Sequence, residues 1–381
     1  MRKILLALLL FFPLLTFSQP LTEASNISIT KFWSQEPNGF TYPMSIHVPT
    51  GTVPQNGYPV CILLHGNGGN GSAMLSQFEG ILECHVLVAP TGYLNSWNIC
   101  AENSDAPDVE MLNELIIELQ SFSNIDPNRI RVAGSSNGAG LANRVFIENT
   151  NTGVDAVCAM VSHLNLPQFH SGQFHRPSGV TASSTAYCGY DTPTDPLTSR
   201  RYLNMSNIND PIIPYAGGSS VVGVEFHAAE DAIYTVAQHL GYSGTQLTTG
   251  TIFGNPAAIE FSYLAGNAVH VRGNTGHTAN STQTDYLKGF LSDCTVLTEV
   301  PTLEPDKVSL YPNPTNAFVT LGRTSSEVGH YTVINVLGEE VLRGVAYSRS
   351  TRIGLSDLPD SVYLLKLDGK IFRIVKQSSG I

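Results

Sequence analysis

The sequence predicts an α/β fold, in which helices cover a mostly parallel sheet, followed by a small all-β domain. First, residues 19–294 alternate short apolar runs with longer segments of helical periodicity, which is typical of a parallel sheet with helical crossovers. Second, residues 308–381 contain short strand patterns divided by turn residues, as in an antiparallel sandwich. Third, 381 residues suffice for two domains, and the 42% that are hydrophobic can form a sizeable core.

The first domain is predicted to alternate strands and helices. The segment 40–48 follows a Pro-Asn-Gly turn at 37–39 and alternates apolar with polar residues, which indicates a half-buried strand. Apolar residues at helical spacing predict a helix over 106–122, with Asp105 as its N-cap. Further strands are predicted over 59–64, 85–89, 130–133, 156–161, 259–264 and 268–271. Further helices are predicted over 137–148, 228–240 and 284–291.

A secretory signal peptide is predicted over residues 1–18. Arg2 and Lys3 form a basic start, an apolar run follows over 4–17, and cleavage is expected after Ser18. The apolar run is too short to span a bilayer comfortably, so we expect a secreted protein with no stable membrane insertion. A membrane anchor is the alternative.

Charge and cysteine content narrow the function classes. The formal net charge of −11 argues against non-specific binding to nucleic acid or to anionic membranes. The chain has six cysteines but no CxxC pair, so we expect no zinc site, and we expect no other metal or cofactor. Buried free thiols are predicted for Cys61, Cys84 and Cys158. Any disulfide should join two of the loop residues Cys100, Cys188 and Cys294.

A Gly-x-Ser-x-Gly motif over 134–138 indicates a nucleophile at Ser136. A predicted strand runs into the motif and a predicted helix follows it, which is the setting of a nucleophile elbow. The two glycines allow a tight turn, and the helix N-terminus favours negative charge at the serine hydroxyl. The backbone N–H of Asn137, the next residue, is expected to stabilise an oxyanion.

A second oxyanion donor is expected from the Gly-rich loop Leu64-His65-Gly66-Asn67-Gly68-Gly69-Asn70, which follows a predicted strand. We predict Asn67 for this role, with Gly68 as the second choice. A phosphate cradle is the alternative, but the loop lacks the Gly-Lys-Ser/Thr ending. His65 precedes the nucleophile, so we expect it to be structural.

An acid and a base should follow Ser136 in the chain. Asp210 follows a strand pattern, and His277 lies in a loop after another predicted strand. We predict that His277 accepts the proton of Ser136 and that Asp210 orients His277 and stabilises its charged form. Asp191 and Asp195 are the rival acids.

Several motifs together resemble a family of secreted α/β-hydrolase esterases that includes polyhydroxybutyrate depolymerase-like and feruloyl or acetylxylan esterase-like enzymes. They are the Gly-rich loop 64–70, Ser96-Trp97-Asn98, Asp108-Val109, 126–130, 134–138, 210–218 and Gly276-His277-Thr278. The resemblance implies the same roles for Ser136, Asp210 and His277. Two departures concern the surroundings of the site. Ser206 and Asn207 stand where the family often has His-Gly, and Ala279-Asn280 where it often has Trp-Pro.

Two further residues are candidates for substrate binding. Trp97 is predicted either to form an aromatic wall of the site or to pack in the core, and His163 lies in a loop that we expect beside the pocket. His163, His170 and His175 also raise the alternative of a metal site, although their spacing fits no helical or hairpin pair of ligands. Asp108 is expected to cap the helix that follows it.

The C-terminal domain is predicted over 308–381, after a polar linker over 295–307. Its strand patterns cover 308–310, 319–321, 331–336, 340–344, 351–355 and 362–367. The Tyr-Pro-Asn-Pro opening at 311–314, the Val-Leu-Gly at 336–338 and the basic end at 373–376 resemble the sorting domain of cargo for type IX secretion. The resemblance implies the type IX secretion machinery as a partner and removal of the tail. A carbohydrate-binding sandwich is the alternative.

These patterns predict a secreted serine hydrolase that cleaves carboxylic esters through an acyl-Ser136 intermediate. Its expected substrates are acetyl or feruloyl esters linked to polysaccharide. An extracellular polyhydroxyalkanoate depolymerase is the first alternative, and a non-catalytic binding protein on a hydrolase scaffold is the second.

Overall fold

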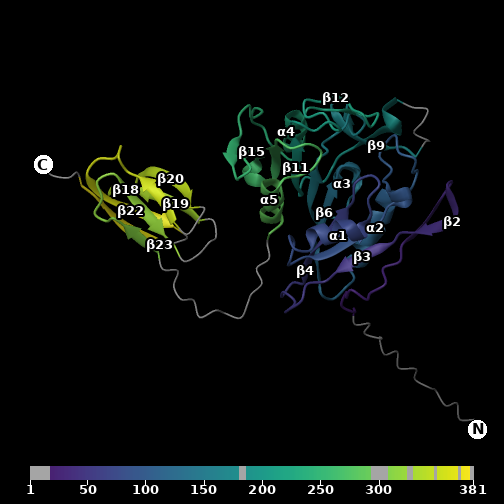
Figure 1. The fold of residues 1–381 in the computed structure, drawn as a ribbon, viewed down its shortest axis with the longest axis horizontal. Helices are drawn as coiled ribbons and strands as arrows, with labels where there is room; N and C mark the ends of the chain where they lie inside the picture. Colours follow the sequence, from purple (N-terminus) through teal and green to yellow (C-terminus); the bar gives the residue numbers. More distant parts are fainter. Residues whose placement is uncertain are drawn as a thin grey trace, which may run out of the picture. The chain divides into compact units, whose positions relative to one another are not determined.

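The computed structural model describes residues 18–179, 186–292, 308–323, 329–346, 350–367 and 370–377. Nearly all of the predicted signal peptide and the whole predicted linker 295–307 lie outside these residues. The chain divides into two compact units, Met1–Val296 and Leu297–Ile381 (Figure 1). Each unit has its own hydrophobic core.

The first unit is built on a nine-stranded sheet, with the strand order β14-β15-β16-β11-β7-β6-β4-β5-β3. The strands from β5 to β16 in this order run parallel, and β3, β15 and β14 are antiparallel to their neighbours. Their bounds are β3 Met44–His47, β4 Tyr58–Leu64, β5 Val86–Pro90, β6 Ile125–Ser135, β7 Val154–Met160, β11 Arg201–Asn207, β14 Thr251–Phe253, β15 Ala258–Tyr263 and β16 Ala268–Gly273.

Helices cover both faces of this sheet. Alternate residues of β4 enter different cores, because successive side chains of a strand point to opposite faces. Val60 and Ile62 pack with residues of α2, α3 and α4, whereas Cys61 and Leu63 pack with residues of α1 and α5. The helices are α1 Gly71–Phe78, α2 Asp108–Leu119, α3 Asn137–Glu148, α4 Ala229–His239 and α5 Ser281–Leu291. The predicted α/β-hydrolase fold class is therefore confirmed.

Short elements surround the sheet. A three-stranded sheet and two hairpins lie in the connections, and single 3₁₀ turns follow some strands. The strands are β1 Thr30–Trp33, β2 Glu36–Thr41, β8 Phe169–His170, β9 Gln173–Pro177, β10 Tyr190–Thr194, β12 Gly218–Ser219 and β13 Glu225–Phe226. The 3₁₀ turns are η1 Tyr93–Asn95, η3 Ala186–Gly189 and η4 Leu264–Gly266.

Several local predictions in the N-terminal half are wrong. The predicted turn at 37–39 lies inside β2, and the segment 40–48 is divided between β2 and β3. Pro43 lies between these strands, and a proline has no N–H to offer a ladder. Asp105 is also not an N-cap, since α2 begins at Asp108 after Pro107.

Asp108 does not cap α2 with its side chain either. It is fully buried, and its carboxylate accepts hydrogen bonds from the Tyr42 hydroxyl at 2.9 Å and the Asn98 backbone N–H at 2.7 Å. Burial raises the pKa of Asp108 to about 7. Asp108 therefore ties three segments of the first unit together.

The cysteine predictions are partly confirmed. Cys100 and Cys188 form a disulfide, and Cys61 and Cys158 are free, buried thiols. Cys84 was predicted to be a free thiol and is instead disulfide-bonded. It lies in a turn before β5 and is half-buried, so it is not a core residue of the strand. Cys294 lies outside the described residues.

The second unit is an all-β sandwich. Its two sheets have the orders β17-β18-β21 and β20-β19-β22-β23. β23 was not predicted, because its segment 373–376 was interpreted as a basic terminal motif; its Ile374 lies in the core. The bounds are β17 Ser309–Tyr311, β18 Phe318–Gly322, β19 Gly329–Ile334, β20 Glu340–Ala346, β21 Ser350–Gly354, β22 Ser361–Leu367 and β23 Lys370–Lys376.

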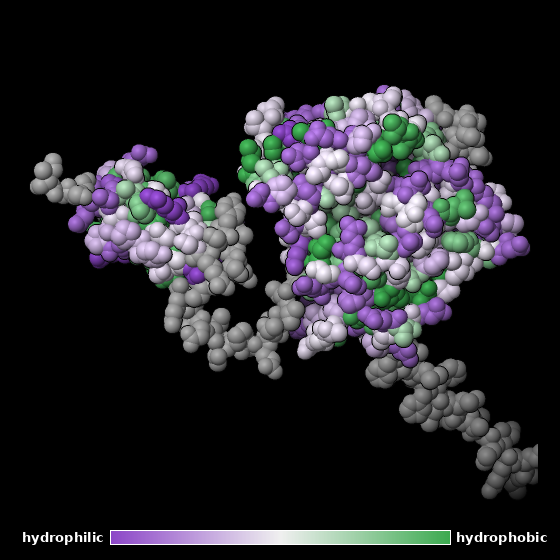
Figure 2. All heavy atoms as spheres, in the orientation of Figure 1, coloured by the Kyte–Doolittle hydropathy of each residue, from purple (hydrophilic) through white to green (hydrophobic). Residues whose placement is uncertain are grey.

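The surface visible in Figure 2 is mixed, with small apolar patches scattered among polar residues in both units. Within the described ranges, no helix has the length and apolar character needed to cross a membrane.

Candidate active site

Ser136 occupies a sharp turn between β6 and α3. Its backbone has φ 55° and ψ −117°, a strained conformation for a residue with a side chain. The flanking glycines are required sterically. A Cβ atom at Gly134 would lie 2.0 Å from the Gly138 carbonyl oxygen, and one at Gly138 would lie 2.2 Å from the Leu64 carbonyl oxygen. The turn thus presents the serine hydroxyl at the carboxyl end of β6.

The structure brings Ser136, His277 and Asp210 together. His277 Nε2 lies 2.7 Å from Ser136 Oγ, and His277 Nδ1 lies 2.8 Å from Asp210 Oδ2. Because Nδ1 faces a carboxylate, it carries the proton, and Nε2 can accept one from the serine hydroxyl. All three residues follow the carboxyl ends of parallel strands, β6, β16 and β11. This array can make the serine hydroxyl a nucleophile.

Asp210 is buried and well supported. Only 2% of its side chain is exposed, and its second oxygen, Oδ1, accepts hydrogen bonds from the backbone N–H groups of Ile212 and Ile213. The rival acids lie elsewhere. Asp191 accepts a hydrogen bond from Ser178, and the side chain of Asp195 is 98% exposed.

The loop that carries His277 is held by Asn207, whose role the sequence analysis missed. Asn207 Nδ2 donates hydrogen bonds of 2.9 Å to the carbonyl oxygens of Gly276 and Thr278, the two neighbours of His277. Asn207 is fully buried. The only sign of this role in the sequence was that residues 206–207 differ from the pattern of the esterase family they resemble. That difference marked the position but did not show what the Asn207 side chain contacts.

The two predicted oxyanion donors belong to residues that line the cleft of Ser136. Asn67 follows β4, Asn137 begins α3, and both residues line the same cleft as Ser136. Within the described chain, no protein acceptor takes either of these N–H groups. The second choice, Gly68, is wrong because its N–H donates to the Asn95 carbonyl oxygen at 2.8 Å. Asn67 and Asn137 are therefore available to an oxyanion.

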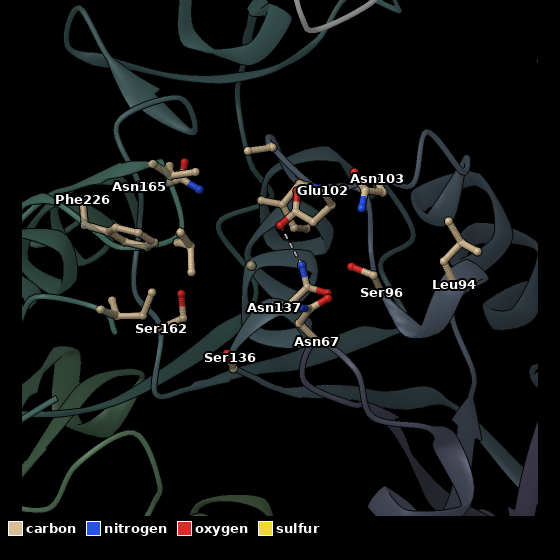
Figure 3. Close-up of a pocket in the computed structure, with 16 residues that line it drawn as sticks. Asn67, Leu94, Ser96, Glu102, Asn103, Ser136, Asn137, Ser162, Asn165 and Phe226 are labelled. Atoms are coloured by element: carbon tan, nitrogen blue, oxygen red, sulfur yellow. Dashed lines mark hydrogen bonds between the residues drawn. The ribbon is translucent and has the colours of Figure 1, made fainter. Parts of the chain in front are cut away.

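The cleft above Ser136 has a volume of about 550 Å³. One part of its lining is polar and includes Ser96, Asn103 and Asn165, while another part is apolar and includes Phe226. Figure 3 shows these residues around the opening, with Ser136 at its base. The remaining lining residues are Asn67, Leu94, Ile99, Ala101, Glu102, Asn137, Gly140, Ser162, Ile213, Val222 and Val224.

Trp97 and His163 do not line the cleft. Trp97 packs in the core, which was the alternative prediction for it, and the prediction that His163 binds substrate is wrong. Trp97 is fully buried; its indole N–H donates to the His65 carbonyl oxygen at 2.8 Å and its ring lies against the His65 ring. His163 is 1% exposed beneath Phe226. Burial lowers the pKa of His163 to about 4, which keeps it neutral.

The other histidines have structural contacts. His65 Nε2 accepts a hydrogen bond from the Gly92 N–H at 3.0 Å, as its predicted structural role requires. The rings of His170 and His175 are stacked with their centroids 3.7 Å apart. Among the residues that the structure describes, no group of three His, Cys, Asp or Glu side chains is arranged to hold a metal ion.

Comparison with known proteins gives one family match and several similar structures. Residues 309–378 match the family described as secretion system C-terminal sorting domain. No curated protein matches the chain. The carboxylesterase of Bacillus cereus is 16% identical over 66% of this chain and 93% of its own, with a TM-score of 0.43. The acetyl xylan esterase of Aspergillus awamori is 13% identical over 69% of this chain and 98% of its own, also with a TM-score of 0.43.

Proposed function

We propose that this chain is a secreted serine hydrolase of carboxylic esters. The observation that carries the proposal is the linear array of Asp210, His277 and Ser136, with hydrogen bonds of 2.8 and 2.7 Å, at the base of a cleft. The catalytic domain is assigned to residues 19–294, and the sorting domain to 308–381.

The geometry supports a two-step mechanism. His277 takes the proton of Ser136 as Oγ bonds to the ester carbonyl carbon, and the carbonyl oxygen gains negative charge beside the N–H groups of Asn67 and Asn137. His277 then gives the proton to the departing alcohol, which leaves acyl-Ser136. In the second step His277 takes a proton from a water molecule as the water oxygen bonds to the acyl carbon. The bond between that carbon and Ser136 Oγ then breaks, the acid leaves, and His277 gives the proton to Oγ. Asp210 stabilises the charged imidazolium in both steps.

Substitution of the nucleophile tests the proposal. We expect Ser136→Ala to lower turnover of p-nitrophenyl butyrate by about five to six orders of magnitude. The neighbouring Ser135→Ala is the matched control and should stay within about tenfold of wild type, because Ser135 does not touch the array. A fluorophosphonate probe should label the wild type and not Ser136→Ala. Absence of labelling in both would favour the non-catalytic binding protein.

For the substrate, we propose acetyl or feruloyl esters linked to polysaccharide. Ser96, Asn103 and Asn165 give the cleft wall hydrogen-bonding groups suited to hydroxyl-bearing substrates, and Phe226 adds an aromatic surface. The alternative, a polyhydroxyalkanoate depolymerase, is favoured by exposed apolar residues, since Leu94 is 60% exposed and Val222 is 45% exposed at the cleft. Turnover of methyl ferulate, acetylated xylan and a polyhydroxybutyrate film should be compared. Clearing of the film alone would reverse this ranking.

Export is proposed from both ends of the chain. Residues 1–18 have the pattern of a signal peptide, and residues 309–378 match the sorting-domain family. We infer that the sorting domain engages the type IX secretion machinery and brings the catalytic domain to the cell surface or the medium.

A further inference from the structure

Glu102 is the single charged residue among the described residues that line the cleft. The other lining residues are apolar, amide or hydroxyl side chains and glycine, so no cationic side chain of the lining balances its charge. The formal net charge of the whole chain, which includes Glu102, is also negative, at −11. A substrate in this cleft therefore meets a negative potential.

The Glu102 carboxylate is held in place by three hydrogen bonds. Its Oε2 accepts from the backbone N–H groups of Ile99 at 3.1 Å and Cys100 at 2.6 Å. Its Oε1 accepts from Asn137 Nδ2 at 2.8 Å, the contact drawn in Figure 3. Cys100 is itself fixed by its disulfide to Cys188. The carboxylate consequently has little freedom to swing away from an unfavourable ligand.

Glu102 also lies close to the reacting group. Asn137 directly follows Ser136, and its side chain bonds to Glu102 on one side and to both backbone groups of Trp97 on the other. The carboxylate is thus hydrogen-bonded to the side chain of Asn137, whose backbone supplies one of the two proposed oxyanion N–H groups. Protein surrounds much of the cleft, so a unit charge on a bound substrate interacts with Glu102 more strongly than two charges at the same separation would in bulk water.

We propose that Glu102 determines charge specificity, so that the cleft accepts esters that are neutral or cationic and rejects esters that carry a carboxylate. This inference rests on the proposed esterase function. An anionic group that enters the cleft loses water and gains no cationic partner there, so rejection follows from like-charge repulsion. Acetyl and feruloyl esters of neutral sugars fit this rule, whereas succinyl esters, and acetyl esters on the hydroxyl groups of uronic acids, do not.

The test uses esters matched in size that differ in charge. One pair varies the acyl group, p-nitrophenyl butyrate against the p-nitrophenyl monoester of succinate. The other varies the alcohol, an alkyl ferulate against a carboxyalkyl ferulate. We expect kcat/KM of the wild type to be about tenfold lower for the anionic member of at least one pair, and the ratio to shrink at high salt. Equal kcat/KM within both pairs would overturn the proposal.

Glu102→Gln should bring the discriminating pair to within about threefold of equality. Gln places an amide N–H against Asn137 or the 99–100 backbone, so a general loss of activity is expected, and the ratio within a pair cancels it. Glu225→Gln is the matched control: Glu225 is exposed on β13 between Val224 and Phe226, whose side chains face the cleft. It should leave the ratio unchanged.

The outcomes separate this inference from the proposed function. No turnover of p-nitrophenyl butyrate by the wild type would contradict the esterase proposal itself. Turnover of the neutral esters with an unaltered charge ratio in Glu102→Gln would contradict the role of Glu102 alone. If Glu102→Gln does not fold, the wild-type ratios and their salt dependence still decide whether the cleft selects by charge.

Discussion

Asn207 illustrates how one buried amide controls the position of a catalytic base. It bridges the carbonyl oxygens on both sides of His277, while Asp210 bonds to the His277 ring itself. The ring position therefore depends on a side chain that touches neither the substrate nor the reacting atoms. Asn207 is a positioning residue.

We expect Asn207→Ala to lower kcat by roughly ten- to a hundredfold with a small change in KM, because a displaced His277 loses alignment with Ser136. Asn209→Ala is the control: Asn209 donates to the Asn274 carbonyl oxygen in the same loop from an exposed position, so its loss should change kcat by less than about threefold. Steady-state kinetics measures both. Wild-type kcat in Asn207→Ala would show that the loop is held by other contacts.

Predictions for individual residues were correct where the sequence pattern had a direct physical cause. Ser136, Asp210 and His277 were predicted to act together, and the structure places them in hydrogen-bonded contact. The Gly-x-Ser-x-Gly motif and the order of the three residues in the chain were enough to predict the array, because each residue follows the end of a parallel strand. Trp97 was predicted either to line the site or to pack in the core, and His163 was predicted beside the substrate; both are buried. Sequence pattern does not tell which side of a loop a side chain faces.

At the scale of elements, the connection from β6 to α3 depends on close contact with β4. A Cβ atom at Gly138 would lie 2.2 Å from the Leu64 carbonyl oxygen and 2.5 Å from that of His65, and neither backbone group can move without shifting β4. The turn at Ser136 and the loop of Asn67 are therefore coupled through one glycine.

We expect Gly138→Ala to lower the free energy of unfolding by about 1–3 kcal/mol and to reduce kcat, because the helix must move away from β4. Gly289→Ala in α5 is the control: a Cβ atom there has no neighbour within 4 Å, and alanine favours a helix, so stability should rise by about 0.5–1 kcal/mol. Urea unfolding measures both changes. Equal stability of the two variants would contradict the steric argument.

Elements with strong periodicity were predicted well. The helix predicted over 137–148 is α3. The strands predicted over 59–64, 85–89, 156–161 and 268–271 lie within two residues of the bounds of β4, β5, β7 and β16, whereas β6 begins five residues before the predicted 130–133. The strand predicted over 40–48 was misplaced because the Pro-Asn-Gly signal at 37–39 lies inside β2, a strand with no buried residue. Where burial is slight, local turn preference gives way to pairing with a neighbour.

At the scale of the whole molecule, buried ionisable groups make stability depend on pH. Burial lowers the pKa of His163 to about 4 and that of His270 to about 3, from an ordinary value of 6.5. The unfolded chain therefore binds protons below pH 6.5 that the native protein does not. Asp108 has the opposite effect, because its pKa is raised from 3.8 to about 7 and the native state holds its proton more tightly.

We expect stability to be highest above about pH 6.5 and to fall on acidification, with each histidine contributing up to about 1.4 kcal/mol per pH unit. Urea unfolding between about pH 7 and pH 4.5 measures the slope. His270→Gln should make the loss shallower, and Asp108→Asn should make it steeper, since it removes the opposing group. A steeper loss in His270→Gln would contradict the assignment of His270 as neutral and buried.

The sequence alone determined the fold class, the array of Ser136, Asp210 and His277, and the sorting tail. These depend on local patterns: period of hydrophobicity, the glycines of a tight turn, and the order in which strands end. The tertiary structure decided that Glu102 lines the cleft, that Asn207 holds the loop of His277 from within the core, and that Trp97 and His163 are buried. A cleft is built from segments far apart in the chain, and its lining depends on how their loops pack, which no local pattern records.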